Sequence, residues 1–187
     1  MNLIILGAPG SGKGTQAEKI ASEFHLAHIS GGASLRKEID SGSRKGELIE
    51  HVMEKGDLVP FETISSVIEP EILAHKDGFI LDGSPRDLTQ AEYLNQFLKE
   101  NKIEINMVLY LHVPDEKLVE RLLLRAKTED RPDDNLESIQ ERFRVFHKET
   151  EPVISFYKQN AKFLEINGDR SVEEIAKELS NIIGQQI

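Results

Sequence analysis

A glycine-rich segment near the N-terminus constrains the fold more than any other feature. Residues 7–15 read Gly-Ala-Pro-Gly-Ser-Gly-Lys-Gly-Thr, between the apolar run 3–6 and a helical pattern. They follow the phosphate-loop pattern G-x-x-x-x-G-K-[ST], except that Gly14 follows Lys13 and the hydroxyl arrives one residue later, at Thr15. Glycines let backbone N–H groups turn toward a phosphate, and the following helix adds the positive end of its dipole. The segment therefore predicts a nucleoside triphosphate site.

Short apolar runs alternate with longer segments of helical period along the chain. The runs are nearly continuously apolar, as strands buried on both faces of a parallel sheet are. The predicted strands are 3–6, 26–29, 79–81, 107–113 and 163–166. The predicted helices are 15–24, 34–39, 46–55, 63–75, 88–99, 115–127, 136–160 and 171–183, the last with Ser171 and Glu174 as a capping box. The alternation predicts an α/β fold, a three-layer sandwich around a central five-stranded parallel sheet.

Two stretches lack a strand where one would be expected. Residues 30–60 hold two short helical patterns, punctuated by glycines that include Gly31-Gly32. Residues 126–136 form a mainly polar connector. We expect both stretches to be lobes or lids that protrude from the sheet. No repeat or linker separates another folding unit, so residues 1–187 are expected to form a single domain.

The composition excludes several classes of function. The chain of 187 residues has a formal net charge of −10 and no cysteine. Nucleic-acid affinity comes largely from neutralisation of phosphates by Lys and Arg, so broad nucleic-acid binding is not expected. Without cysteine there is no disulfide, thiol catalysis or Cys-ligated zinc. The apolar run 3–6 is too short for a signal peptide or a membrane span. We expect a soluble cytoplasmic protein, without a membrane partner, that does not require oligomerisation.

Arginines are concentrated in one part of this acidic chain, which suits a small anionic ligand better than a polymer. They are Arg121, Arg125, Arg131, Arg142 and Arg144. Salt bridges along solvated helices are the alternative, because acidic residues lie nearby. Those are Glu120, Glu129, Asp130 and Glu141. The six histidines are scattered and form no metal-binding pattern, so no metal site is assigned to them.

Further segments carry a family resemblance. They are Gly-Asp-Leu-Val-Pro at 56–60, Gly-Phe-Ile-Leu-Asp-Gly-Ser-Pro-Arg at 78–86, His28-Ile29-Ser30 followed by Leu35-Arg36, Arg131-Pro132-Asp133-Asp134, and Thr-Glu-Pro-Val-Ile at 150–154. Together with the Gly-Lys-Gly-Thr end of the loop they resemble, in order and over nearly the whole chain, the adenylate kinase family. The short connector at 126–135 is similar to the short-lid form of that family, which has no zinc-binding insertion. The resemblance implies a helical monophosphate-binding lobe at residues 30–60 and a short lid at residues 126–136.

The resemblance implies a reaction. It is the reversible transfer of the γ-phosphoryl group of MgATP to AMP, which gives two ADP. The implied partners are ATP and a nucleoside monophosphate, with AMP preferred, and the implied cofactor is Mg²⁺ without structural zinc. Because both reactants are polyanions, the protein contributes mainly position and positive charge. The acceptor is already a phosphate oxygen anion, so no general base is needed.

The resemblance also implies the site residues. Catalytic roles fall to Lys13, Arg86, Arg125, Arg131 and Arg142. ATP binding falls to Gly10, Ser11, Gly12, Lys13, Gly14, Thr15, Arg121, Arg125 and Arg170. AMP binding falls to Gly31, Arg36, Asp57, Leu58, Val59, Gly83, Ser84, Pro85, Arg86, Gln90, Arg131 and Arg142. Asp82 is expected to hold Mg²⁺ through water.

Some of these residues have more specific expected roles. Arg36 and Arg86 should clamp the acceptor phosphate, since a guanidinium can bind two oxygens at once. Arg121 should pack its planar group on the donor adenine, and Gln90 should contact the acceptor base. The alternatives are structural: the helical arginines could be ordinary surface residues, and Asp82 could stabilise the turn that follows it.

Three positions depart from the family pattern. Gly31 stands where the family usually has a threonine that frames the acceptor base, and Ala33 stands where it has an aspartate near the phosphates. Ser84 replaces an aromatic or bulky apolar residue. A pocket with fewer specific polar contacts discriminates less well among bases. We therefore expect AMP to be the preferred acceptor with looser base selectivity, and a UMP or CMP kinase is the alternative.

Two other classes of protein are less consistent with the sequence. A regulatory module that binds nucleotide without transfer is favoured by Ala33 but disfavoured by the intact Lys13, Arg36, Arg86 and Arg131. A switch GTPase should carry an Asn-Lys-x-Asp segment for guanine, and the sequence has none.

Overall fold

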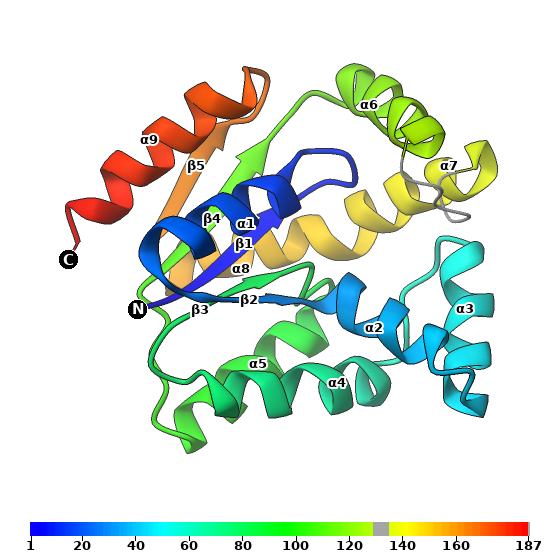
Figure 1. The fold of residues 1–187 in the computed structure, drawn as a ribbon, viewed down its shortest axis with the longest axis horizontal. Helices are drawn as coiled ribbons and strands as arrows, with labels where there is room; N and C mark the ends of the chain where they lie inside the picture. Colours follow the sequence, from blue (N-terminus) through cyan, green and yellow to red (C-terminus); the bar gives the residue numbers. More distant parts are fainter. Residues whose placement is uncertain (129–134, 187) are drawn as a thin grey trace.

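Five parallel strands form the centre of the computed structural model, which describes residues 1–128 and 135–186 (Figure 1). The strands are β1 (Asn2–Gly7), β2 (Ala27–Ser30), β3 (Phe79–Asp82), β4 (Met107–His112) and β5 (Phe163–Asn167). Their order across the sheet is β2-β3-β1-β4-β5, and each neighbouring pair is parallel. The predicted five-stranded parallel sheet is confirmed.

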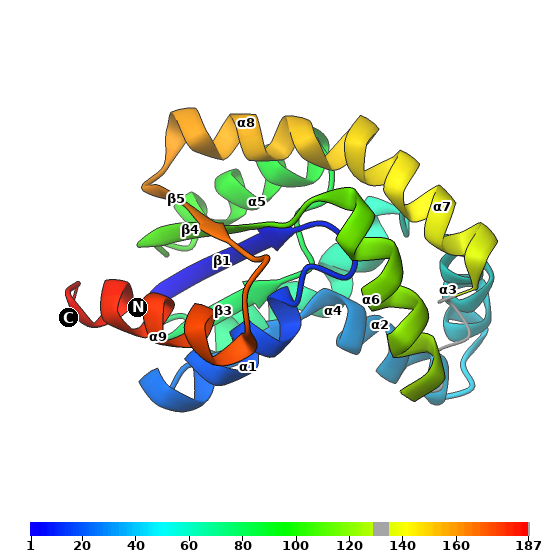
Figure 2. The same cartoon turned by 90° about the horizontal axis from the view of Figure 1, so that it is seen from above.

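Helices connect the strands and cover both faces of the sheet (Figure 2). They are α1 (Lys13–Phe24), α2 (Gly31–Asp40), α3 (Arg44–Glu54), α4 (Phe61–Ala74), α5 (Leu88–Glu100), α6 (Asp115–Thr128), α7 (Leu136–Val145), the π-helical turn η1 (Phe146–Thr150), α8 (Glu151–Asn160) and α9 (Val172–Gly184). Among the described residues, no helix has both the length and the apolar character that a membrane span needs.

The side chains of β1 divide the core into two layers. Leu3 and Ile5 pack with α1 and α9 on one face, and Ile4 and Leu6 pack with α4, α5 and α8 on the other. This alternation follows from the two-residue period of a strand. Since β1 is buried along its whole length, it holds the loop that follows it at a fixed place.

Several helix boundaries differ from the sequence prediction. Helix α1 begins at Lys13 rather than at residue 15. Helix α2 begins at Gly31, so the pair Gly31-Gly32 forms the first turn of this helix. The helix can begin there because the Ser30 hydroxyl caps it, accepting a hydrogen bond from the Ala33 N–H at 3.4 Å. Helix α3 begins at Arg44, where the Ser43 hydroxyl accepts from the Gly46 N–H at 2.9 Å.

The segment 136–160 was predicted as one helix, and it is helical throughout, but residues Phe146–Thr150 widen into a π-helical turn. Pro152 explains the change. Proline has no N–H to donate and its ring crowds the carbonyl four residues earlier, so the preceding turn must open. The predicted capping box of α9 is confirmed: the Glu174 N–H donates to Ser171 Oγ at 3.3 Å, and the Ser171 N–H donates to Glu174 Oε2 at 3.0 Å.

Helices α2 and α3 extend away from the sheet edge, beyond the carboxyl ends of the strands (Figure 1). They pack closely on one another, and α2 also contacts α4. That residues 30–60 form a monophosphate-binding lobe stays a prediction. Most of the predicted lid, residues 126–136, lies outside the described residues.

Candidate active site

The loop between β1 and α1 is shaped by two glycines with left-handed backbone. Gly10 has φ 81° and Gly12 has φ 88°. A Cβ at Gly10 would lie 2.9 Å from Leu122 Cγ, so only glycine fits between the loop and α6. Gly12 is the N-cap residue of α1, and within the described part of the chain no side chain caps this helix. The first amides of α1 are therefore available to an anion, at the positive end of the helix dipole.

Two strands, β2 and β3, place polar side chains beside this loop. Asp82 ends β3, next to Ile5 of β1 and opposite Ser30 of β2. The Ser30 hydroxyl donates to Asp82 Oδ2 at 3.5 Å, and His28 Nε2 lies 3.6 Å from the same oxygen. Asp82 Oδ1 is buried and makes no hydrogen bond with the described residues. Lys13 Nζ donates to the Ala8 carbonyl at 3.3 Å.

The protonation of Lys13 and Asp82 is set by burial and by neighbouring charges. Burial lowers the pKa of Lys13 to about 8; Asp82 opposes this shift, while Arg86, Arg142 and Arg125 add to it. Burial acts to raise the pKa of Asp82, but the proximity of His28 and the charge of Lys13 outweigh burial and hold that pKa below its usual value. At neutral pH the pair is therefore an ammonium beside a carboxylate.

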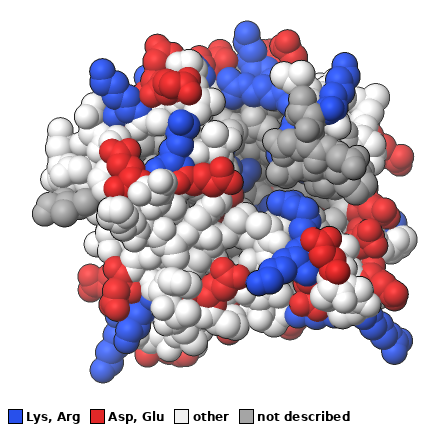
Figure 3. Space-filling view, in the orientation of Figure 1, with Lys and Arg blue, Asp and Glu red and all other residues white. Residues whose placement is uncertain are grey.

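A cleft of about 700 Å³ opens beside the loop. Its basic lining residues are Lys13, Arg36, Lys37, Arg86, Arg121, Arg125 and Arg142, and its acidic ones are Glu18, Asp57, Glu71 and Asp82. Lys and Arg side chains border a hollow in the middle of this face of the molecule (Figure 3). The cleft thus carries an excess of positive charge in a protein of net charge −10, as a site for a polyanion requires.

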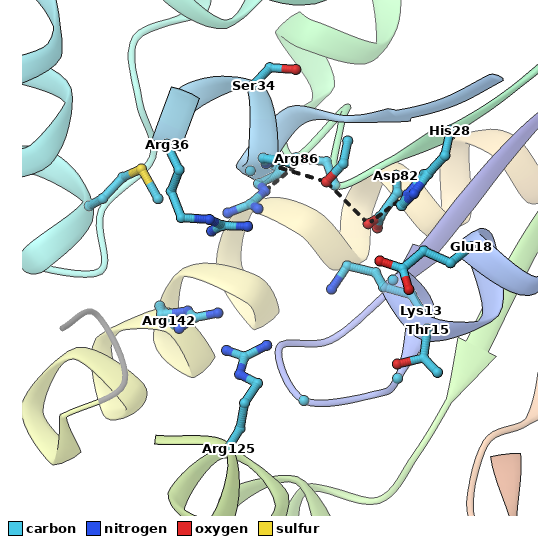
Figure 4. Close-up of a pocket in the computed structure, with 18 of the residues that line it drawn as sticks. Lys13, Thr15, Glu18, His28, Ser34, Arg36, Asp82, Arg86, Arg125 and Arg142 are labelled. Atoms are coloured by element: carbon cyan, nitrogen blue, oxygen red, sulfur yellow. Dashed lines mark hydrogen bonds and ion pairs between the residues drawn. The ribbon is translucent and has the colours of Figure 1, made fainter. Parts of the chain in front are cut away.

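The guanidinium groups of four arginines point into the space in front of Lys13 (Figure 4). They come from different elements: Arg36 from α2, Arg86 from the turn after β3, Arg125 from α6 and Arg142 from α7. Arg86 is oriented by its own turn, since its Nε donates to the Gly83 carbonyl at 2.8 Å. The Thr150 hydroxyl donates to the Arg86 carbonyl at 2.7 Å, which ties this turn to η1.

Most residues predicted from the sequence border this space. Those that line the cleft are Gly10, Gly12, Lys13, Gly14, Thr15, Arg36, Asp57, Asp82, Gly83, Arg86, Arg121, Arg125 and Arg142. A smaller adjoining pocket is lined by Leu58, Ser84 and Pro85. Ser11 and Val59 are buried. Arg131 lies outside the described residues. The roles of all these residues stay predictions.

Two arginines expected at the donor nucleotide have protein partners. Both terminal nitrogens of Arg121 donate to the Gly168 carbonyl at 3.1 Å, and Asp169 Oδ1 lies 3.5 Å away. Arg170 pairs with Glu178 and donates to the Asn167 carbonyl at 3.1 Å. Arg121 still lines the cleft, whereas Arg170 does not line it.

Residues expected at the acceptor base lie deeper than the phosphate clamps. Gln90 is 5% exposed and accepts a hydrogen bond from the Arg86 N–H at 2.9 Å. It lines a small pocket between α4 and α5 rather than the main cleft, and Ser84 lines the same pocket. Gly31 is buried, and a Cβ there would lie 3.2 Å from Ile64 Cδ1.

Sequence reasoning assigned no role to several residues that line the cleft: Glu18, His28, Ser34, Lys37 and Glu71. Glu18 could have been found, because it lies one helical turn after Gly14 and therefore on the same side of the helix as that residue of the phosphate loop. Ser34 donates to Glu71 Oε1 at 3.2 Å across α2 and α4. No sequence signal links that pair.

A phosphate loop on the first strand of a parallel sheet, facing further arginines across a cleft, defines a P-loop phosphotransferase. Comparison with known proteins agrees: residues 5–162 match the family model described as Adenylate kinase. The chain is 42% identical to the adenylate kinase of Xanthomonas campestris, over 99% of this chain and all of that protein. It is 38% identical to that of Petrotoga mobilis, over 98% and 97% of the two chains.

A vertebrate relative matches over a similar span. The chain is 39% identical to adenylate kinase isoenzyme 1 of Gallus gallus, over 97% of this chain and 93% of that protein. The chain belongs to the adenylate kinase family.

This family implies use of MgATP, and the residues of the site fit that ligand. The buried Asp82 Oδ1, which makes no hydrogen bond with the described residues, is a suitable acceptor for a water molecule of hydrated Mg²⁺. The glycines of the loop leave room for phosphate oxygens. Among residues 1–128 and 135–186, no group of three or more His, Cys, Asp or Glu is arranged to bind a metal ion directly. These residues fit a magnesium ion carried by the nucleotide.

Proposed function

We propose that this protein is an adenylate kinase that transfers the γ-phosphoryl group of MgATP to AMP and runs the reaction in both directions. The observation that carries the proposal is the basic cleft, with the phosphate loop on one wall and Arg36 and Arg86 on the other. The family relationship supports AMP–ATP phosphotransfer and does not favour a UMP or CMP kinase.

The donor phosphates would bind to the loop amides and to Lys13. Lys13 is held toward the cleft by the Ala8 carbonyl and by the charge of Asp82. Asp82 would hold Mg²⁺ through water, with the Thr15 hydroxyl as a second oxygen group on the same wall. When bound, Mg²⁺ supplies positive charge that offsets the charge of the donor phosphates.

The acceptor phosphate would bind to Arg36 and Arg86, each of which offers a planar fork of donors. Arg125 and Arg142 would contact the group in transfer, together with Arg131, for which the sequence is the only support. The positive groups reduce repulsion between the two nucleotides and hold them in line. A phosphate oxygen of AMP is the attacking group, so these residues need not remove a proton.

A coupled assay of ADP formation from ATP and AMP tests the proposal. Wild-type protein should be active, and Lys13→Ala should lower kcat by about 100-fold or more, because a charged donor to the transferring group is lost. Lys19→Ala is the matched control, since Lys19 lies exposed on the same helix and outside the cleft. If wild type binds ATP but forms no ADP, the protein is a nucleotide-binding module and the proposal fails.

We further propose that the acceptor site is less selective for its base than is usual in the family. The buried Gly31 has no hydroxyl to offer, Ala33 has no carboxylate, and Ser84 opens toward the pocket that contains Gln90. Steady-state rates with AMP, CMP, UMP and GMP test this. AMP should be preferred by less than about 1000-fold, given that a missing polar contact lowers discrimination. A preference for AMP of several orders of magnitude, about 1000-fold or more, would contradict it.

The remaining expectations also belong to the proposal. The free nucleotides are the partners, nucleic acid is not bound, no oligomer is required, and the protein acts in the cytoplasm. The formal net charge of −10 supports the expectation that nucleic acid is not bound, because an acidic protein repels a polyanionic chain.

A further inference from the structure

The two helices that lie outside the sheet end in the same way. After α2, the Gly42 N–H donates to the Ile39 carbonyl at 2.9 Å; after α3, the Gly56 N–H donates to the Met53 carbonyl at 3.0 Å. Both glycines are left-handed, with φ 66° and 81°. Each is the first residue after the C-cap, the position where glycine commonly ends a helix. Helix termination alone therefore explains both glycines equally well.

Their surroundings differ. A Cβ at Gly42 would meet nothing within 4 Å. A Cβ at Gly56 would lie 2.7 Å from the Ser138 carbonyl oxygen, 3.1 Å from Arg142 Cγ and 3.3 Å from Glu141 Cβ. Gly56 is buried at this contact, where the end of α3 lies beside α7 in both views (Figures 1 and 2). At Gly56, unlike at Gly42, the missing side chain leaves room for a neighbouring helix.

We propose that Gly56 is a positioning residue: by lacking a Cβ, it lets the end of α3 pack directly against α7 and so seats the Arg142 guanidinium in the cleft. The nearest atom, the Ser138 carbonyl oxygen, belongs to the turn that carries Arg142, because residues i and i+4 are hydrogen-bonded in an α-helix. A backbone oxygen cannot turn away as a side chain can. A Cβ at Gly56 therefore displaces this turn of α7 as a unit.

The cleft is sensitive to such a displacement. Gly56 and Arg142 line the same cleft, and both also line the adjoining pocket. The Arg142 guanidinium points toward Lys13 (Figure 4), and its charge contributes to the lowered pKa of that lysine. A shift of about 1 Å in a group that orients a reacting phosphate can cost as much as about 100-fold in rate. The inference rests on the proposed function, in which Arg142 contacts the group in transfer.

A matched pair of variants separates this role from helix termination. Gly56→Ala and Gly42→Ala impose the same left-handed strain after neighbouring helices, but only Gly56→Ala adds a collision. We expect Gly56→Ala to lower kcat for ADP formation about tenfold or more, whereas Gly42→Ala should change it less than about twofold. Thermal unfolding should show a loss of stability in both. Equal rates in the two variants would overturn the proposal.

A double-mutant cycle tests whether Gly56 acts through Arg142. In an Arg142→Ala background, Gly56→Ala should change kcat less than about twofold, because the group that it displaces is already absent. An undiminished tenfold effect in that background would show that Gly56 acts on something else, and the proposal would fail. If Gly56 had a purely structural role, Gly56→Ala would lower Tm, but its effect on kcat would be as large in the Arg142→Ala background as in the wild type.

Two further measurements keep the test decisive. If Gly56→Ala does not fold, Gly56→Asn and Gly42→Asn repeat the comparison, since Asn tolerates left-handed backbone better than Ala but still adds a Cβ. The same cycle can be measured on the Kd for ATP by calorimetry, which does not depend on transfer. If wild type forms no ADP, the proposed function fails, and the coupling of Gly56 to Arg142 is decided by the Kd values alone: additive effects on Kd would overturn it.

Discussion

The charged groups of the cleft are held in two different ways. Lys13, Asp82 and Arg86 lie within a few residues of the ends of β1 and β3, and each is oriented by nearby backbone or strand neighbours. Arg36, Arg125 and Arg142 come from α2, α6 and α7, which reach the cleft from outside the sheet. The strand-borne groups have positions fixed by the buried sheet. The positions of the helix-borne groups depend on how the helices pack, as at Gly56.

The comparison predicts a difference between the two arginines assigned to the acceptor phosphate. Arg86→Ala should lower kcat/KM for AMP about 100- to 1000-fold, because a preorganised donor is lost. Arg36→Ala should lower it less, about tenfold, mainly through KM, since a donor on a less constrained helix contributes more to binding than to the transition state. Steady-state kinetics with saturating MgATP measures both.

Lysine substitutions sharpen this test. Arg86→Lys should recover little activity, because an ammonium cannot reproduce the fork that the Gly83 carbonyl orients. Equal losses for Arg86→Ala and Arg36→Ala would show that anchoring to the sheet makes no difference to catalysis.

The same comparison describes what sequence alone could predict. The strand-borne groups of the site depend on features that are local in sequence. The apolar runs predict the strands, and the phosphate loop and the turn at 83–86 follow those strands directly. Side chains carried by the helices have partners that are distant in sequence. Nothing near Arg121 in sequence indicates that it binds the Gly168 carbonyl, and nothing near Thr150 indicates that its hydroxyl donates to the Arg86 carbonyl. Such contacts depend on packing between distant segments.

Helix ends show the same limit. The capping box at Ser171 and Glu174 could be predicted because its two partners are three residues apart. The close approach of α7 to Gly56 could not, because glycine after a helix is already explained by termination. The π-helical turn before Pro152 lies between these cases: proline signals a disturbance, but the sequence does not specify whether the helix breaks or widens.

The strand-borne pair Lys13 and Asp82 predicts how nucleotide binding depends on pH. The pKa of Lys13 is about 8, so its ammonium is lost as pH rises above that value. Bound phosphates favour the charged form and raise this pKa, so binding of ATP should take up a proton near pH 8. The Kd for ATP should then weaken by up to about tenfold per pH unit above 8. Calorimetry in two buffers of different ionisation enthalpy measures the uptake.

Asp82→Asn provides the check on this pH dependence. The Asp82 charge raises the pKa of Lys13, so its removal should move the onset of the pH dependence to lower pH. Lys13→Arg should abolish the dependence, because a guanidinium keeps its proton throughout this range. A pH dependence that persists in Lys13→Arg would assign it to another group.

A titratable contact also lies among the helices, and we expect its effect on stability to be the smallest of those predicted. His147 of η1 lies between the start of α6 and the start of α8: its Nε2 is 2.8 Å from Asp115 Oδ2 and its Nδ1 is 2.8 Å from Glu151 Oε1. The hydrogen bond to Glu151 and the charge of Asp115 raise the pKa of His147 above its usual value, although burial opposes them. Both ring nitrogens can donate only when the ring is protonated.

The raised pKa of His147 determines how its contribution to stability changes with pH. The contribution of His147 is fully present below its unfolded pKa of about 6.5 and is lost as pH rises through the folded value. The contact is exposed, so its contribution to stability is small. The Tm of the wild type should exceed that of His147→Gln at pH 6, and this difference should shrink by at most about 3 °C between pH 6 and pH 8. His51→Gln, on the exposed face of α3, is the matched control. If the Tm difference between wild type and His147→Gln grew with pH, the bridge would not stabilise the protonated ring. The position of α6 relative to α8 would then depend on apolar packing alone.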